Sequence, residues 1–155
     1  MPPYKHTQVS YPIFCIASAI LIGFIYLQAT ARAETPSVDS GTNFALTAVM
    51  LLIVFVLESF ITLTVTVDEQ AVGICFTWGI VRKKFAVSEI ASVKTVRNPW
   101  YYGWGIKLRL WPKMWIFSVA GYDAVELTMK NGTAYRIGTN EPEKLEVAIK
   151  RVAGV

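Results

Sequence analysis

The segment Val125–Ile137, VELTMKNGTAYRI, carries the strongest local folding signal in this 155-residue chain. Apolar and polar residues alternate on both sides of its centre, which is the pattern of a strand with one buried face. At the centre, Asn131 and Gly132 form a dipeptide that favours the two positive φ angles of a type I′ turn. The apolar positions are Val125, Leu127, Met129, Tyr135 and Ile137. The segment therefore predicts a β-hairpin.

The residues after the hairpin predict an amphipathic helix. Asn140 can cap its start, Pro142 suits its first turn, and Glu143 occupies the reciprocal position of a capping box. Gly154 can end it. The apolar residues recur at i, i+3, i+4 and i+7, and they are Leu145, Ala148, Ile149 and Val152. This stripe predicts that the helix packs against the strands.

Short strands are expected before the hairpin. From Thr62 to Val67, threonines alternate with aliphatic residues, and a polar turn follows at residues 68–70. Residues 71–85 favour two short strands or one bent strand, with the bend at Gly79. Residues 87–96 favour one more strand. Short antiparallel strands followed by one helix predict a small α+β domain over residues 64–155, a β-barrel or sandwich capped by the C-terminal helix.

Two apolar segments precede these strands. Residues 11–28 (YPIFCIASAILIGFIYLQ) have no charge, and residues 44–63 (FALTAVMLLIVFVLESFITL) have only Glu58. A transmembrane helix needs about 20 predominantly apolar residues. The whole chain is 54% apolar and 17% charged, against about 45–50% and 25% in soluble proteins. We therefore expect residues 1–63 to form a tail and a transmembrane helical hairpin, with spans at about 11–28 and 44–63.

The distribution of charge predicts the orientation of this hairpin. From Thr64 onward there are 13 Lys+Arg against 8 Asp+Glu, whereas the connection between the spans has only Arg32, opposed by Glu34 and Asp39. The positive-inside rule places both termini in the cytoplasm.

A secretory signal peptide is the alternative for residues 1–33. Lys5 and His6 precede the first apolar stretch, and Ala31-Arg32-Ala33 has the small residues of a cleavage site. The basic start is weak and the apolar stretch is long for a signal peptide. The retained hairpin is therefore preferred, and cleavage stays open.

Three blocks give the chain a resemblance to a known family. They are residues 98–106 (NPWYYGWGI), residues 121–127 (GYDAVEL) and, after Asn131-Gly132, residues 136–142 (RIGTNEP). Their spacing and the closing helix resemble the small bacterial membrane proteins in which two transmembrane helices precede a pleckstrin-homology-like (PH-like) domain. The resemblance covers roughly residues 65–152. It implies a PH-like fold at the bacterial inner membrane, and it implies no activity and no catalytic residues.

Two groups of residues are candidates for contact with membrane lipid. Aromatic and basic side chains alternate between Lys94 and Trp115, a mixture that suits the headgroup zone. The candidates in this segment are Trp100, Tyr101, Tyr102, Trp104, Lys107, Arg109 and Lys113. The second group is the basic run Arg82, Lys83 and Lys84, which resembles the strand-end cations of phosphoinositide-binding PH domains. The alternatives are that the aromatic residues pack the core and that both sets of cations are solvated.

The sequence offers little for catalysis or cofactors. The only histidine, His6, falls in a segment expected to be a flexible tail, so no His-based acid–base pair and no His/Cys metal set is expected. No phosphate-binding or dinucleotide motif occurs. Gly103-x-Gly105 lacks the third glycine of such a motif. We therefore expect a non-enzyme with no cofactor or metal, and the membrane anchor argues against nucleic acid.

Two functions follow from this organisation. The leading hypothesis is a membrane-anchored PH-like binding or scaffold module on the cytoplasmic face, engaging anionic lipid headgroups or a membrane protein partner. The alternative is a structural subunit that assembles through its hairpin, with other membrane proteins or as a homo-oligomer. Small residues that allow close helix approach support the alternative, and they are Ala17, Ser18, Ala19 and Gly23.

Overall fold

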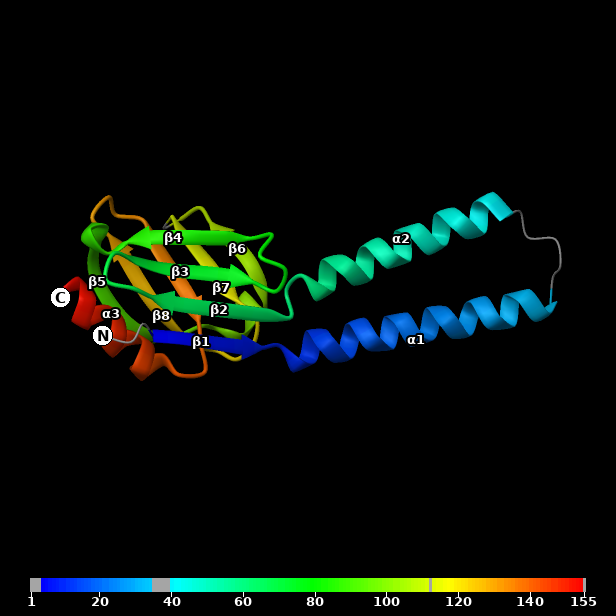
Figure 1. Ribbon diagram of the computed structural model, residues 1–155, viewed down its shortest axis with the longest axis horizontal. Coiled ribbons are helices and arrows are strands. Elements are labelled where there is room, and N and C mark those ends of the chain that lie inside the picture. The colour runs from blue at the N-terminus through cyan, green and yellow to red at the C-terminus, as the bar shows by residue number, and fades with distance from the viewer. Residues whose placement is uncertain (1–3, 35–39, 112, 155) are drawn as a thin grey trace.

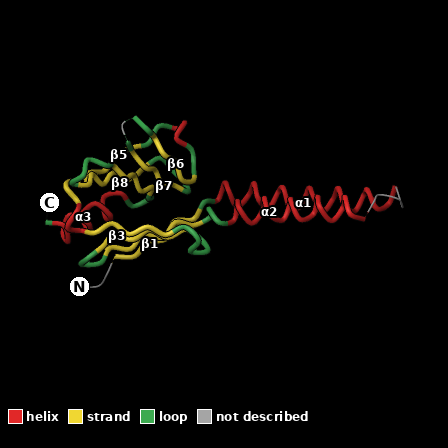
Figure 2. The backbone as a smooth tube through the Cα atoms, turned by 90° about the horizontal axis from the view of Figure 1, so that it is seen from above, coloured by secondary structure: helices red, strands yellow, loops and turns green. Residues whose placement is uncertain are grey.

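The structure is a computed structural model that describes residues 4–34, 40–111 and 113–154. Two β-sheets form two layers, a C-terminal helix lies at one end of them, and two long helices extend from the other end (Figures 1 and 2). The protein is therefore an α+β structure. The described strands remain in two separate sheets and close no barrel.

The first sheet is antiparallel and has four strands. In spatial order they are β1 (Tyr4–Val9), β2 (Thr62–Val67), β3 (Ala71–Phe76) and β4 (Arg82–Ala86). The alternation predicted for residues 62–67 is confirmed, because Leu63, Val65 and Val67 are buried and the threonines face the other way. The predicted bend at Gly79 is the turn between β3 and β4, where this glycine has a φ of 67°.

The second sheet has five strands in the order β5-β8-β9-β7-β6. Their bounds are Ile90–Arg97 (β5), Gly105–Arg109 (β6), Met114–Ser118 (β7), Asp123–Met129 (β8) and Ala134–Gly138 (β9). A short 3₁₀ turn, η1 (Val87–Glu89), precedes β5. The prediction of purely antiparallel strands is wrong at one place, because β7 and β9 pair in parallel.

One hydrophobic core lies between the sheets. Leu63 and Phe76 enter it from the first sheet, and Leu127 and Ile137 enter it from the second. The C-terminal helix α3 (Pro142–Ala153) closes this core with the predicted apolar stripe: Leu145 and Ile149 are fully buried, and Ala148 and Val152 pack beside them. The helix is therefore part of the core.

The β8–β9 hairpin is confirmed, but its turn is not type I′. Among the described residues only glycines have a positive φ, so Asn131 does not have the angle that this turn requires. Gly132 N donates to Met129 O and Met129 N donates to Thr133 O, both at 2.9 Å. These bonds enclose a three-residue loop in which only its last residue, Gly132 with a φ of 80°, needs the left-handed conformation.

The predicted capping box of α3 is wrong. The residue before the helix is Glu141, and its side chain makes no capping hydrogen bond. Asn140 instead accepts a hydrogen bond from His6 Nε2 through its Oδ1 atom. The end of the helix is as predicted, since Gly154 has a φ of 68° and its N–H donates to Lys150 O.

The two long helices are α1 (Tyr11–Glu34) and α2 (Ser40–Glu58), and they lie side by side in both views (Figures 1 and 2). Helix α2 ends at Glu58, so the second span predicted to residue 63 is wrong over its last five residues. From Thr62 the alternating pattern forms β2, and the side chain of Leu63 is fully buried in the core.

The N-terminal segment predicted to be a flexible tail is a strand. Residues 4–9 form β1, which pairs with β2 along its whole length, Tyr4 opposite Val67 and Val9 opposite Thr62. The helix pair is therefore inserted between two paired strands. Because β1 and β2 are held together, the helix pair begins and ends at the same end of the four-stranded sheet (Figure 1).

Candidate functional site: an aromatic and basic surface

The connection between β5 and β6 presents large aromatic side chains to solvent. It contains a short 3₁₀ turn, η2 (Trp100–Tyr102), in which Trp100 is 78% exposed. Trp111, in the turn between β6 and β7, is 89% exposed. The residues that form this aromatic–basic surface are Trp100, Tyr101, Trp104, Leu110 and Trp111, with the exposed cations Lys107, Arg109 and Lys113. The interpretation that the aromatic residues pack the core is thus wrong for Trp100, Tyr101, Trp104 and Trp111.

Strand alternation places two of the cations on the outer face of the five-stranded sheet. Ile106 pairs with the core residue Phe117, so Lys107 and Arg109 point to the opposite face. Trp115 is the aromatic residue of this segment that does join the core, where it stacks on Phe117 with ring centroids 6.4 Å apart.

A buried carboxylate organises the same outer face. Glu126 on β8 is only 8% exposed. It accepts a hydrogen bond from Arg136 Nε at 2.7 Å and pairs with Lys94 Nζ at 3.0 Å. Arg136 also donates to Asn98 Oδ1 at 3.2 Å, which ties the sheet to the first residue of the β5–β6 connection. The carboxylate therefore fixes the loop that carries Trp100.

Tyr102 extends this network to the surface. Its hydroxyl accepts a hydrogen bond from Arg109 Nη1 at 2.6 Å, and its ring lies 5.8 Å from the Arg136 guanidinium carbon. Arg109 also donates from Nε to Trp111 O at 2.9 Å. Tyr102 and Arg109 thus position the surface, while Trp100 and Trp111 are left free to make contacts.

The charge state of Glu126 follows from these contacts. Burial by itself raises the pKa of this carboxyl, but the hydrogen bonds and charges of Arg136 and Lys94 outweigh burial and hold the pKa below its usual value. Glu126 is therefore an anion at neutral pH. In the described part of the chain, Lys107, Arg109 and Lys113 form no ion pair within 4.0 Å, so the surface is net positive.

The predicted basic run does not form one cluster. Strand β4 alternates, so Lys83 points inward and Arg82 and Lys84 point outward. Lys83 Nζ lies 4.6 Å from the Tyr135 ring centroid and 5.5 Å from that of Trp115. Arg82 Nε donates to Gly79 O at 2.8 Å in the β3–β4 turn. These residues lie on the four-stranded sheet and not on the aromatic–basic surface.

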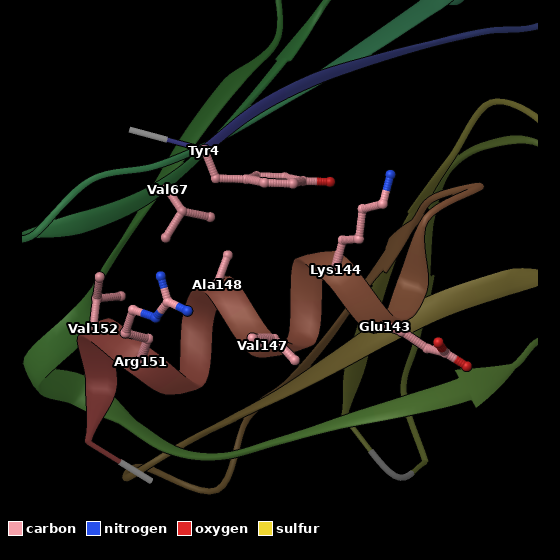
Figure 3. Close-up of a pocket in the computed structure, with 8 residues that line it drawn as sticks. All are labelled: Tyr4, Val67, Glu143, Lys144, Val147, Ala148, Arg151 and Val152. Atoms are coloured by element: carbon pink, nitrogen blue, oxygen red, sulfur yellow. The ribbon is translucent and has the colours of Figure 1, made fainter. Parts of the chain in front are cut away.

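A cavity of about 490 Å³ lies between β1, β2 and helix α3 (Figure 3). Its lining is Tyr4, Val67, Glu143, Lys144, Val147, Ala148, Arg151 and Val152. Burial, and then the nearby carboxylate of Glu141, raises the pKa of Tyr4, whose hydroxyl has no hydrogen-bond partner in the described part of the chain. The cavity is mainly apolar, and its charged lining residues are Glu143, Lys144 and Arg151.

The sequence interpretation missed Leu110 and the structural role of Glu126. An isolated leucine gives no signal of exposure, and a glutamate on the polar side of the β8 alternation gives no signal of burial. No group of three or more His, Cys, Asp or Glu side chains that could hold a metal ion occurs among the residues that the structure describes. Comparisons with protein-family models, with curated proteins and with solved structures found no match to this chain.

Proposed function

We propose that this chain is a membrane-anchored binding module whose helix pair crosses the inner membrane of a bacterium and whose PH-like β-domain lies on the cytoplasmic face. The observation that carries the proposal is the helix pair itself. Ile22, Tyr26 and Leu52 are each more than 60% exposed on helices that project from the domain (Figure 1). Apolar helices exposed in this way require a nonpolar environment.

The length of α1 fits a bilayer, and the apolar part of α2 is shorter. One helix, over Tyr11–Thr30, is long and apolar enough to cross a membrane, and Phe44–Glu58 of α2 is a shorter apolar stretch. At about 1.5 Å per residue, the 24 residues of α1 and the 19 of α2 extend about 36 Å and 28 Å, against a hydrocarbon thickness of about 30 Å. Gln28 Nε2 donates to Thr47 Oγ1 at 3.4 Å, a polar contact that joins the two helices.

The pairing of β1 with β2 supports a retained first helix and a common side for both termini. Cleavage after Ala33 would remove β1 and with it the hydrogen bond from Gln8 Nε2 to Ala120 O at 2.9 Å. A chain that crosses with α1 must return with α2 for β1 and β2 to pair. The basic β-domain then favours the cytoplasm for that side.

We further propose that the aromatic–basic surface binds an acidic patch on a membrane protein partner. The two sheets form layers that extend along the direction of the helix pair (Figure 2), so the outer face of the five-stranded sheet is turned sideways, along the plane of the proposed membrane. A partner in the same membrane can reach all of it, whereas a flat bilayer can reach only its helix-proximal end. Exposed Trp residues beside cations are typical of binding surfaces.

Anionic lipid is the second candidate ligand for this surface, and it could bind only the end that lies near the helices. Asn98 N donates to Tyr122 O at 2.6 Å. The β7–β8 connection that contains Tyr122 also contains Ala120, whose carbonyl binds Gln8 next to the start of α1. Trp100 and Tyr101 therefore lie toward the membrane end of the sheet, and Trp111 and Lys113 lie away from it.

Assembly through the helices is a weaker candidate. Ala17 is only 4% exposed and faces α2, and Ala19 and Gly23 border a gap between the helices that Leu46 and Met50 also line. The small residues are therefore used, at least in part, inside the chain's own helix pair.

Membrane anchoring is tested on the full chain by extraction of membranes at alkaline pH, which should leave it in the pellet. Binding is tested by a benzophenone amino acid at Trp111, with Val147, 55% exposed on α3, as the matched position. Cross-linking from Trp111 to one protein, lost when Lys107 and Lys113 become Gln, supports the proposed partner. Adducts to lipid alone favour the second candidate, and no adduct at Trp111 above the Val147 level refutes the binding role.

A further inference from the structure

The turn between β3 and β4 presents apolar side chains at the end of the β-domain from which the long helices leave (Figure 1). Trp78 is 56% exposed and Ile80 is 62% exposed. Neighbouring Val81, by contrast, packs against the core. The exposed pair is therefore set apart from the core and lies beside the helix pair.

Trp78 lies next to the last turn of α2. Its ring stacks on that of Phe55 with centroids 6.4 Å apart and an interplanar angle of 20°. Phe55 precedes the final residue of α2, Glu58, by three positions, or about 4.5 Å along the helix axis. The turn thus reaches back alongside the apolar part of the helix.

The turn is held firmly in this position. Thr77 Oγ1 accepts a hydrogen bond from Thr62 N at 2.8 Å, at the start of β2. Gly79 N donates to Phe76 O at 2.7 Å, and Arg82 Nε donates to Gly79 O at 2.8 Å. A side chain that is presented by a fixed turn loses little conformational freedom when it meets a surface.

We infer that the β3–β4 turn is a third membrane contact beside the two helices. Trp78 and Ile80 enter the boundary between headgroups and acyl chains, and the exposed guanidinium of Arg82 lies among the lipid phosphates. Tryptophan is enriched at this depth because its ring is apolar and its N–H needs a polar partner. The inference rests on the proposed anchoring of α1 and α2, and it adds that the β-domain is pressed end-on against the bilayer.

The test is the depth of spin labels on the full chain in nanodiscs of phosphatidylcholine and phosphatidylglycerol. Cysteine replaces Ile80 in a background without the two free cysteines, Cys15 and Cys75. Ile25 on α1, 59% exposed, is the lipid reference. Lys130, in the β8–β9 turn at the end far from the helices (Figure 1), is the water reference. Accessibility to oxygen and to a water-soluble nickel chelate is measured at each.

The label at Ile80 should be accessible to oxygen and shielded from nickel, between the two references. If Ile25 lies in lipid and Ile80 matches Lys130, the turn is in water and the inference fails while the anchoring stands. If Ile25 is itself open to nickel, the proposed anchoring fails and the inference fails with it.

Tryptophan quenching gives a second measurement without labels. In nanodiscs that contain lipid brominated near the headgroup end of the chain, Trp78→Phe should lower the quenched part of the Trp emission. Trp111→Phe, at the far end of the five-stranded sheet, should leave it unchanged. Equal quenching of the wild-type chain and the Trp78→Phe variant would overturn the inference even if the spin-labelled variants did not fold.

Discussion

In the four-stranded sheet, β2 and β3 bury every second side chain and leave the others half-exposed, whereas β8 of the five-stranded sheet buries side chains on both faces. The outer face of β2 is a row of threonines. The outer face of β8 has Glu126, which is bound to Arg136, and Arg136 in turn donates to Asn98 of the loop that carries Trp100.

This difference separates a sheet whose outer face is half-exposed from a sheet whose outer face holds a buried carboxylate in an ion pair. A polar outer face needs no further structure, because water satisfies it. A buried carboxylate is costly unless it is paired, and Glu126 on β8 is paired with Arg136 and Lys94. Arg136 also binds Asn98, at the start of the loop that carries Trp100.

The largest effects are expected where the two sheets are alike, in their common core. Leu63→Ala on β2 and Leu127→Ala on β8 each remove a fully buried side chain. Each should lower the free energy of unfolding by about 2–5 kcal/mol, measured by urea unfolding of the detergent-solubilised chain. A loss from only one of the two would show that the sheets do not unfold as one unit.

The outer faces should then differ. Glu126→Gln keeps the shape of the side chain and removes the charge that binds Arg136 and Lys94, so it should cost about 1.5–3 kcal/mol. The matched variant on the other sheet is Thr66→Val, which should stay within about 0.5 kcal/mol of the wild type. Equal effects of the two variants would remove the distinction between the sheets.

The pH dependence of this difference has a definite sign. The folded-state pKa of Glu126 is lowered from its usual 4.5. A lowered pKa stabilises the folded state above the unfolded value, and that stability is lost as pH falls through the folded value. The difference in the free energy of unfolding between the wild type and Glu126→Gln should therefore be full at pH 7 and shrink below about pH 4.5. A gap that is the same at pH 3 and pH 7 would contradict the ion pairing.

The inner faces of β2, β8 and β9 could be predicted from the sequence because local alternation determines them, whereas β6 and β7 were not predicted as strands. The burial of Leu63, Val65 and Val67 follows from the alternation within their own strand. The burial of the α3 stripe follows from its helical spacing. Strand β1 could not be predicted in the same way. Its inward positions are Tyr4, His6 and Gln8, which are polar, and two of them are satisfied by groups more than 100 positions away in the chain.

The candidate site was predictable in part. Composition indicated an aromatic and basic segment, but exposure depends on the fold: Trp111 faces solvent and Trp115 packs in the core. The division of the run at Arg82, Lys83 and Lys84 could have been predicted, because a strand sends alternate residues to opposite faces. The parallel pairing of β7 with β9 was not predicted. Strand β7 (MWIFS) is an almost continuous apolar run, which indicates burial on both faces and does not identify its partner strand.

The loop itself should respond to a smaller change. Tyr102→Phe removes the hydroxyl that accepts from Arg109 and keeps the ring near Arg136. Because this contact is exposed, we expect the free energy of unfolding to fall by an amount at the low end of about 0.5–1.5 kcal/mol. Amide hydrogen exchange should become faster over residues 98–104 and stay unchanged over β2. Unchanged exchange in that loop would show that Tyr102 does not hold it.

The smallest effect on stability is expected where the effect on binding is largest. Lys107→Gln with Lys113→Gln removes two exposed cations that form no ion pair among the described residues, so the free energy of unfolding should move by less than about 0.5 kcal/mol. Arg109 is left in place because it also holds Tyr102.

Cross-linking from Trp111 should nevertheless fall in the double variant. Cross-linking of the wild type should weaken with added salt, because such charges act over a Debye length of about 8 Å at physiological ionic strength. Lys84→Gln, an exposed cation on the four-stranded sheet, is the control for net charge. If it lowers the cross-linking as much as the double variant, the attraction belongs to the whole basic domain, and the two sheets do not differ in function.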